Sequence, residues 1–146
     1  MSRKFSLIVM TLWIGGLWIT GLSAYLLFDT LSSRQMAGMV AGRLFTVISY
    51  IGMASASYLI LQRIFEFGTA TFKQSYFWAV LVMLLLVLAG HFGIQPLLAQ
   101  LKSNSMPNDV MHSVFASRFS TWHGVASIAY LVECLLGFVV ILRARS

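Results

Sequence analysis

The sequence predicts an all-α protein, an integral membrane, antiparallel four-helix bundle with short surface helices on its outer side. Of its 146 residues, 59% are hydrophobic and only 10% are charged. The mean hydropathy of +0.85 lies well above that of a soluble domain. Four apolar stretches also have about the 20 residues that an α-helix needs to cross a hydrocarbon core. The polar stretches between them are too short for a soluble domain, so residues 1–146 are expected to form a single four-span domain.

The four spans are predicted near residues 5–28, 44–61, 76–98 and 121–142. Arg3 and Lys4 precede a first apolar run of full spanning length, which favours a retained helix over a cleaved signal peptide. The second span carries Gly52 and Ala56 four residues apart, and small residues at this spacing suit close packing between helices. The single cysteine, Cys134, lies in the last span, so no disulfide can form within the chain.

Two connections on the outer side have the pattern of surface helices. In "TLSSRQMAGMVAGRLF" the apolar residues recur at three- and four-residue steps: Met36, Met39, Val40 and Leu44. A short interfacial helix is therefore expected before the second span. In "KSNSMPNDVMHSVFASRF" a similar spacing follows the helix breakers Pro107 and Asn108: Val110, Val114, Phe115 and Phe119. This predicts a second surface helix before the last span.

The basic residues indicate the orientation of the chain. With four spans both termini lie on one side of the membrane, and six basic residues are expected there: Arg3, Lys4, Arg63, Lys73, Arg143 and Arg145. Four are expected on the opposite side: Arg34, Arg43, Lys102 and Arg118. The excess favours cytoplasmic termini. The net charge of +6 is therefore interpreted as charge that flanks the spans and faces the lipid bilayer, and a nucleic-acid partner is disfavoured.

Polar residues at the outer ends of the spans form a predicted ligand pocket. Its members are His91, Gln95, His123, Arg43 and Arg118. Ionisable groups inside spans are costly and therefore indicate function. The two histidines could ligate haem b or a metal while the arginines bind propionates, although their depths differ by about 7 Å. The structural alternative is that the histidines only hydrogen-bond neighbouring helices.

Copper is the other metal that the residues suggest, because soft ligands are expected on the outer side: Met36, Met39, Met106, Met111 and His112. The spacing of Met36 and Met39 is more typical of a membrane-facing stripe, so copper is disfavoured.

Glu133 lies near the predicted middle of the bilayer. A bare carboxylate there is costly, so this group is expected to be protonated, hydrogen-bonded or close to water. Tyr130 is the nearest donor on the same helix, and the favoured role is a hydrogen-bond anchor between helices. The alternative is a proton relay that runs from Glu133 through Tyr130, Ser127 and His123 toward the outer side, as in a small transporter.

The order of several motifs resembles that of the transmembrane-protein-205-like family, a bacterial domain of unknown function. The similar pieces are "LWIGGLW" in the first span, "AGMVAGRLF" in the first outer connection, "HFGIQPLLAQLK" and "FSTWHGVAS". The resemblance implies a four-helix protein of the bacterial cytoplasmic (inner) membrane. It directs attention to the matched positions, which are Gly42, Arg43, Leu44, Phe45, His91, Pro96, His123 and Gly124. The family has no settled activity.

Taken together, the residues favour a small structural or accessory membrane protein without catalysis of its own. It is expected to associate with itself or with a larger membrane complex through small-residue faces of its first two helices. On the first helix these faces are marked by Thr11 and Gly15, and by Gly16 and Thr20.

Overall fold

The computed structural model describes residues 3–105, 114 and 116–144, and nearly all of these residues are helical. The elements are α1 (Arg3–Thr30), α2 (Arg34–Phe67), the 3-10 helix η1 (Gly68–Lys73), α3 (Ser75–Ala89), the π-helical turn η2 (Gly90–Ile94), α4 (Gln95–Ser105) and α5 (Ala116–Arg143). Within the described residues, four helical segments are long and apolar enough to cross a membrane: Arg3–Thr30, Arg34–Lys73, Ser75–Asn104 and Ala116–Arg143.

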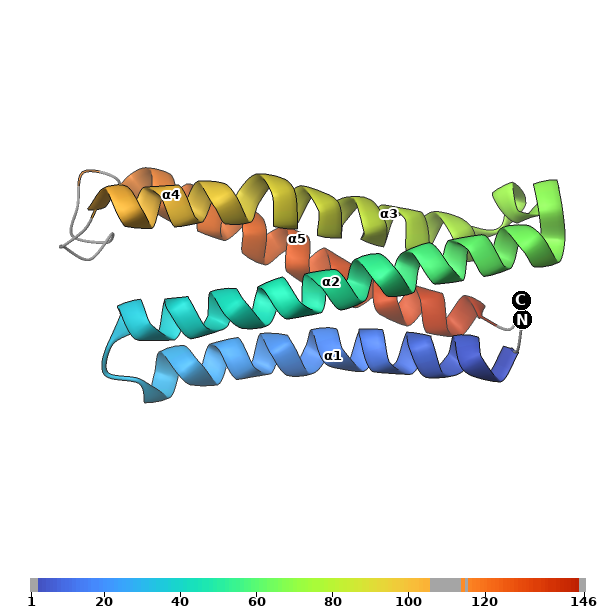
Figure 1. Ribbon diagram of the computed structural model, residues 1–146, viewed down its shortest axis with the longest axis horizontal. Helices are drawn as coiled ribbons and strands as arrows, with labels where there is room; N and C mark the ends of the chain where they lie inside the picture. The colour runs from blue at the N-terminus through green and yellow to red at the C-terminus, as the bar shows by residue number, and fades with distance from the viewer. Residues whose placement is uncertain (1–2, 106–113, 115, 145–146) are drawn as a thin grey trace.

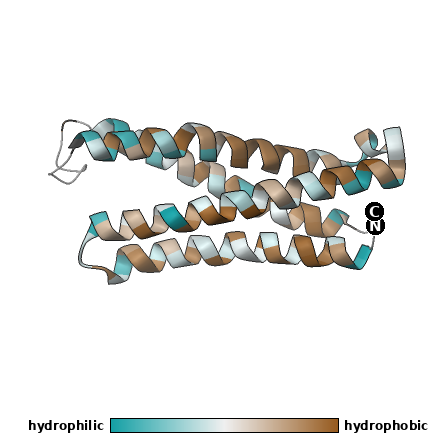
Figure 2. Cartoon of the chain, in the orientation of Figure 1, coloured by the Kyte–Doolittle hydropathy of each residue, from teal (hydrophilic) through white to brown (hydrophobic). Residues whose placement is uncertain are grey.

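The helices lie lengthwise beside one another, and both termini are at the same end of the molecule (Figure 1). We call this end the terminal end and the other the opposite end. The elements α3, η2 and α4 follow one another as a single long rod beside α2, and α5 lies behind them. Hydrophobic residues cover most of the helices, while the most hydrophilic ones lie mainly toward the two ends (Figure 2). This distribution fits a multi-pass membrane protein.

The core is formed by residues from all four spans. Among the described residues, the largest side chains that are completely buried are Trp13, Leu17, Leu59, Met83, Val80, Val140 and Thr71. Many large apolar side chains on the outside are exposed, as expected for helices that face lipid rather than water. The protein therefore has a narrow packed interior and a broad apolar exterior.

Small residues let α1 and α2 approach closely. A Cβ atom added at Gly16 would lie 2.8 Å from the side chain of Ile48, and one at Gly52 would lie 2.9 Å from Nε1 of Trp13. Gly15, on the other side of α1, is exposed and has no neighbouring atom within 4 Å of such a position. Gly16 and Gly52 are thus used for packing within the chain, and Gly15 is not.

The short helix expected to lead into the second span is the beginning of the same long helix. Arg34 begins α2, which continues without a break to Phe67, and Ser33 caps it by accepting a hydrogen bond from the Met36 N–H (3.3 Å). The segment contains no proline, and Ala37, Gly38 and Ala41 are buried. The early turns of α2 therefore belong to the same long helix as the second span.

The second predicted surface helix lies largely outside the described residues. Val110 and Phe115 are outside the described residues, while Phe119 lies in the first turns of α5, which begins at Ala116.

The third span contains a widened turn before Pro96. The Gln95 N–H donates to the carbonyl of Gly90, five residues earlier, so η2 is a single π-helical turn. Proline has no N–H to donate and its ring crowds the carbonyl four residues before it. A widened turn accommodates both effects without ending the helix. It places His91 inside an irregular part of the span.

Candidate functional site

His91 lies in the π-helical turn and is surrounded by aromatic rings. Its ring centre is 4.9 Å from that of Tyr50 and 4.8 Å from that of Phe92, both in edge-to-face geometry. Its Nδ1 atom is buried and has no hydrogen-bond partner among the described residues. His91 is therefore held by packing between α2 and the third span.

Gln95 joins the third span to α2. Its Oε1 accepts a hydrogen bond from the Thr46 hydroxyl (3.3 Å), and its Nε2 donates to the Ser49 hydroxyl oxygen (3.5 Å). Thr46 and Ser49 also donate to backbone carbonyls one turn back in their own helix. The Gln95 amide is thus used to hold two helices together.

The other predicted pocket members lie at the surface. His123 is exposed and stacks on Phe119, with ring centres 5.8 Å apart. Arg43 and Arg118 are exposed as well. Lys102 also approaches the stacked pair of Phe119 and His123: its Nζ lies 5.6 Å from the centre of the Phe119 ring. The ring contacts of His91 and His123 are with different residues, and a ligand pocket formed by the five members stays a prediction.

No group of three or more histidine, cysteine, aspartate or glutamate side chains could hold a metal ion within the described part of the chain. Of the sulfur and imidazole groups weighed for copper, Met36 and Met39 are exposed on α2. Met106, Met111 and His112 lie outside the described residues.

Tyr130 and Glu133 lie on the inner side of α5. The Tyr130 hydroxyl donates to the backbone carbonyl of Leu17 in α1, and its ring packs edge-on against Phe45 at 5.1 Å. Tyr130 thus bonds to another helix instead of to Glu133. The Glu133 side chain is only 5% exposed, and its Oε1 atom has no partner among the described residues.

The other groups of the predicted relay leave the interior. Ser127 and His123 are exposed, and the Ser127 hydroxyl donates to the His123 carbonyl (2.9 Å). The three steps from Glu133 toward the outer side therefore pass from the core to the lipid-facing surface.

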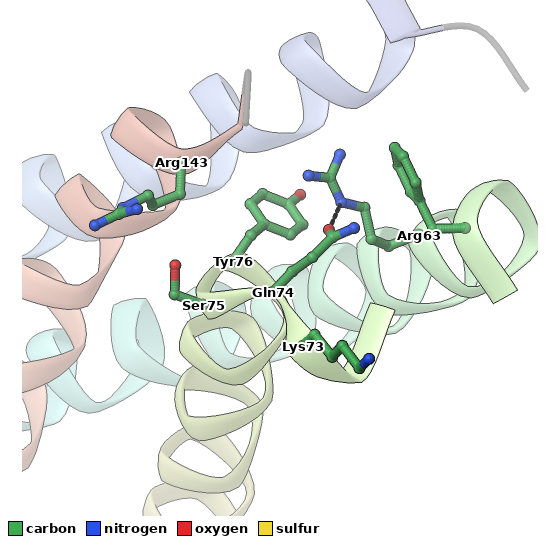
Figure 3. A pocket seen from close by; sticks show the side chains of 7 residues that line it. Arg63, Lys73, Gln74, Ser75, Tyr76 and Arg143 are labelled. Atoms are coloured by element: carbon green, nitrogen blue, oxygen red, sulfur yellow. Dashed lines mark hydrogen bonds between the residues drawn. The ribbon is translucent and has the colours of Figure 1, made fainter. Parts of the chain in front are cut away.

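A hollow that sequence reasoning missed lies at the terminal end, and it is built around Arg63. The Arg63 side chain is only 7% exposed, and its guanidinium carbon lies 4.6 Å from the centres of both the Phe67 and the Tyr76 rings. Its Nε donates to Oε1 of Gln74 (2.6 Å), as the dashed line in Figure 3 shows. Two aromatic faces and an amide oxygen thereby hold the cation in one place.

The chain geometry after α2 explains how Gln74 and Tyr76 reach Arg63. Gly68 ends α2 with a φ of +56°, a conformation that glycine adopts without strain. The short helix η1 then turns the chain back, and the buried Thr71 hydroxyl donates to the Arg63 carbonyl (2.9 Å). This bond fixes the turn on the end of α2, so the start of α3 faces Arg63.

Two adjoining cavities lie on either side of this cluster. One, of about 270 Å³, is lined by Arg63, Phe67, Lys73, Gln74, Ser75, Tyr76 and Arg143 (Figure 3). The other, of about 500 Å³, is lined by Arg3, Ser6, Leu7, Met10, Gln62, Arg63, Glu66, Phe67, Tyr76 and Ala144. Arg63, Phe67 and Tyr76 line both. The sequence signal for this site was an arginine with an aromatic residue four positions later, inside "LQRIFEF".

Comparison with known proteins gives a family without an assigned role. A family model described as a domain of unknown function (DUF4149) matches residues 8–107, which is more than half of the chain. The match includes Arg63, Gln74 and Tyr76 and ends before α5. No curated protein and no solved structure matches the chain.

Proposed function

The chain belongs to the DUF4149 family, whose function is unknown, and we propose that it is a structural or accessory element of a bacterial cytoplasmic membrane, without catalysis of its own. In this proposal all 146 residues form one antiparallel four-span domain with both termini in the cytoplasm. The excess of basic residues at the terminal end supports that orientation. The narrower likeness to transmembrane-protein-205-like proteins stays a prediction.

The proposal is supported by the hydrogen bonds that polar side chains inside the spans make to neighbouring helices. Tyr130 bonds α5 to the backbone of α1, and Gln95 bonds the third span to Thr46 and Ser49 of α2. Each bond of this kind contributes about 0.6 kcal/mol on average in membrane proteins. These groups serve the helix assembly, which favours a scaffold over a reaction centre.

Association with a second helix would use the exposed side of α1. Thr11 and Gly15 are exposed there, and Gly15 leaves open space where a partner helix can approach. The proposed partner is a second copy of this chain or a larger membrane complex.

Native electrophoresis of membranes extracted in mild detergent tests the association. Wild-type protein should migrate above the single chain, and Gly15→Leu should return it to the single chain because the leucine blocks close approach without touching the rest of the fold. Gly42→Leu is the matched control, since Gly42 is also exposed with open space around it. Migration that is unchanged in Gly15→Leu would contradict association through this face.

An absorption spectrum tests the alternative of a haem protein. We expect no Soret band in protein purified from cells supplied with haem precursor. A Soret band that disappears in both His91→Ala and His123→Ala would replace the structural proposal with the cofactor one.

A further inference from the structure

We propose that the larger hollow at the terminal end binds a phosphate-bearing anion, with the head group of an anionic phospholipid as its natural source. The site lies between the start of α1 and the end of α2, and it has a volume of about 500 Å³. The groups that would meet the anion are Arg3, Ser6, Gln62, Arg63 and Tyr76. This inference is independent of the proposed scaffold role.

Ser6 supplies the first sign of a missing ligand. Its side chain is only 5% exposed, it lines the hollow, and its hydroxyl has no hydrogen-bond partner among the described residues. A buried hydroxyl without a partner is unfavourable, and an anionic oxygen that reaches it from the hollow would accept its hydrogen bond.

Arg63 supplies a cation whose position is already fixed. The Phe67 and Tyr76 rings enclose its guanidinium, and Gln74 holds its Nε. In Figure 3 the terminal nitrogens of Arg63 point away from Gln74, on the side where the Tyr76 hydroxyl lies. A planar guanidinium that is held rigid binds phosphate oxygens with little further loss of side-chain entropy.

The charges around the hollow favour an anion. Among its lining residues, Arg3 and Arg63 are basic and Glu66 is acidic, and the Glu66 Oε2 accepts a hydrogen bond from Nε2 of Gln62 (2.6 Å). Lys73 and Arg143 line the adjoining cavity.

The position of the hollow favours a lipid as the source of the phosphate. It lies at the ends of membrane-spanning helices, where basic and aromatic residues meet the head-group layer. The apolar side chains of Leu7 and Met10 continue the lining along α1 toward the hydrophobic part of the molecule. A phospholipid can therefore place its phosphate beside Ser6 and Arg63 while its chains stay in the bilayer.

The test measures binding and thermal stability of the full chain purified in a neutral detergent. Phosphatidylglycerol, phosphatidylcholine and inorganic phosphate are titrated separately against wild-type protein, Ser6→Ala, Arg3→Gln and Arg34→Gln. Arg34→Gln removes the same charge from an exposed position at the opposite end and serves as the control. Arg63 itself is not varied, because it is buried and its loss would disturb folding as well as binding.

We expect phosphatidylglycerol to raise the melting temperature more than phosphatidylcholine does. Ser6→Ala and Arg3→Gln should each weaken its binding about tenfold, which is the effect of one hydrogen bond to a charged group. Arg34→Gln should bind as the wild type does. If inorganic phosphate produces the same variant-dependent effect, the site takes a soluble phosphate. Equal effects of the two lipids, or equal losses in Arg34→Gln and Ser6→Ala, would overturn the proposal.

Discussion

The two ends of the molecule carry basic residues in different surroundings. At the terminal end Arg63 is buried between Phe67 and Tyr76 and bonded to Gln74. At the opposite end Arg43 and Arg118 are exposed. Both groups of residues lie near helix ends, but only Arg63 is enclosed, by Phe67 of its own helix, by Gln74 and by Tyr76 of α3. A basic residue near a helix end therefore becomes part of a site when the following turn brings a second aromatic ring over it.

The largest expected effect comes from removing the buried cation. Arg63→Ala should lower the free energy of unfolding in detergent by about 2–4 kcal/mol, because both ring contacts and the bond to Gln74 are lost. Thermal unfolding followed by circular dichroism measures this loss. The paired variant Arg43→Ala at the opposite end should change stability by no more than about 0.5 kcal/mol. Similar losses in the two variants would remove the difference between the ends.

A smaller effect is expected at the joint between the third span and α2. Gln95→Leu should reduce the free energy of unfolding by about 1 kcal/mol, because Thr46 and Ser49 lose their partner across the helices. Gln100→Leu, at an exposed position of α4, is the matched control and should be close to neutral. If Gln95→Leu is neutral as well, this amide does not hold the helices together.

The smallest effect is expected at His123. The His123→Ala variant should lose about 0.5 kcal/mol or less, because only the exposed stacking on Phe119 disappears. Thermal unfolding in the same detergent is again the measurement. A loss larger than that of Gln95→Leu would contradict a role for His123 that is limited to the exposed stacking on Phe119.

The coarse fold could be predicted from the sequence because the pattern that indicates a membrane-spanning helix is local. The length and hydropathy of each apolar run follow from neighbouring residues, so the four helices could be placed. Pro96 also marks the place where the third span changes its hydrogen bonding. The burial of the first turns of α2 could not be predicted, because the same three- and four-residue spacing describes a surface helix and the start of a long, partly buried one.

The candidate site could not be predicted in the same way, because its contacts join distant parts of the chain. Arg63 was counted as a flanking charge, although Phe67 four residues later was a usable hint. The second ring belongs to Tyr76, which reaches Arg63 only after Gly68 and η1 reverse the chain direction. Likewise, His91 lies in the π-helical turn of the third span and His123 in the first turns of α5, and their side chains contact different neighbours. For Arg63 as for the two histidines, the direction in which the side chain leaves its helix determines which residues it contacts.

A double-mutant cycle tests the difference between the ends most directly. The single and double variants of Arg63→Ala and Gln74→Ala are unfolded in the same detergent as those of Arg43→Ala and Gln95→Ala. The first cycle should give a coupling free energy of about 1 kcal/mol, because the two side chains share a hydrogen bond, and the second should be additive to within about 0.5 kcal/mol. Additivity in the first cycle, or equal coupling in both, would contradict a polar site assembled around Arg63 at the terminal end.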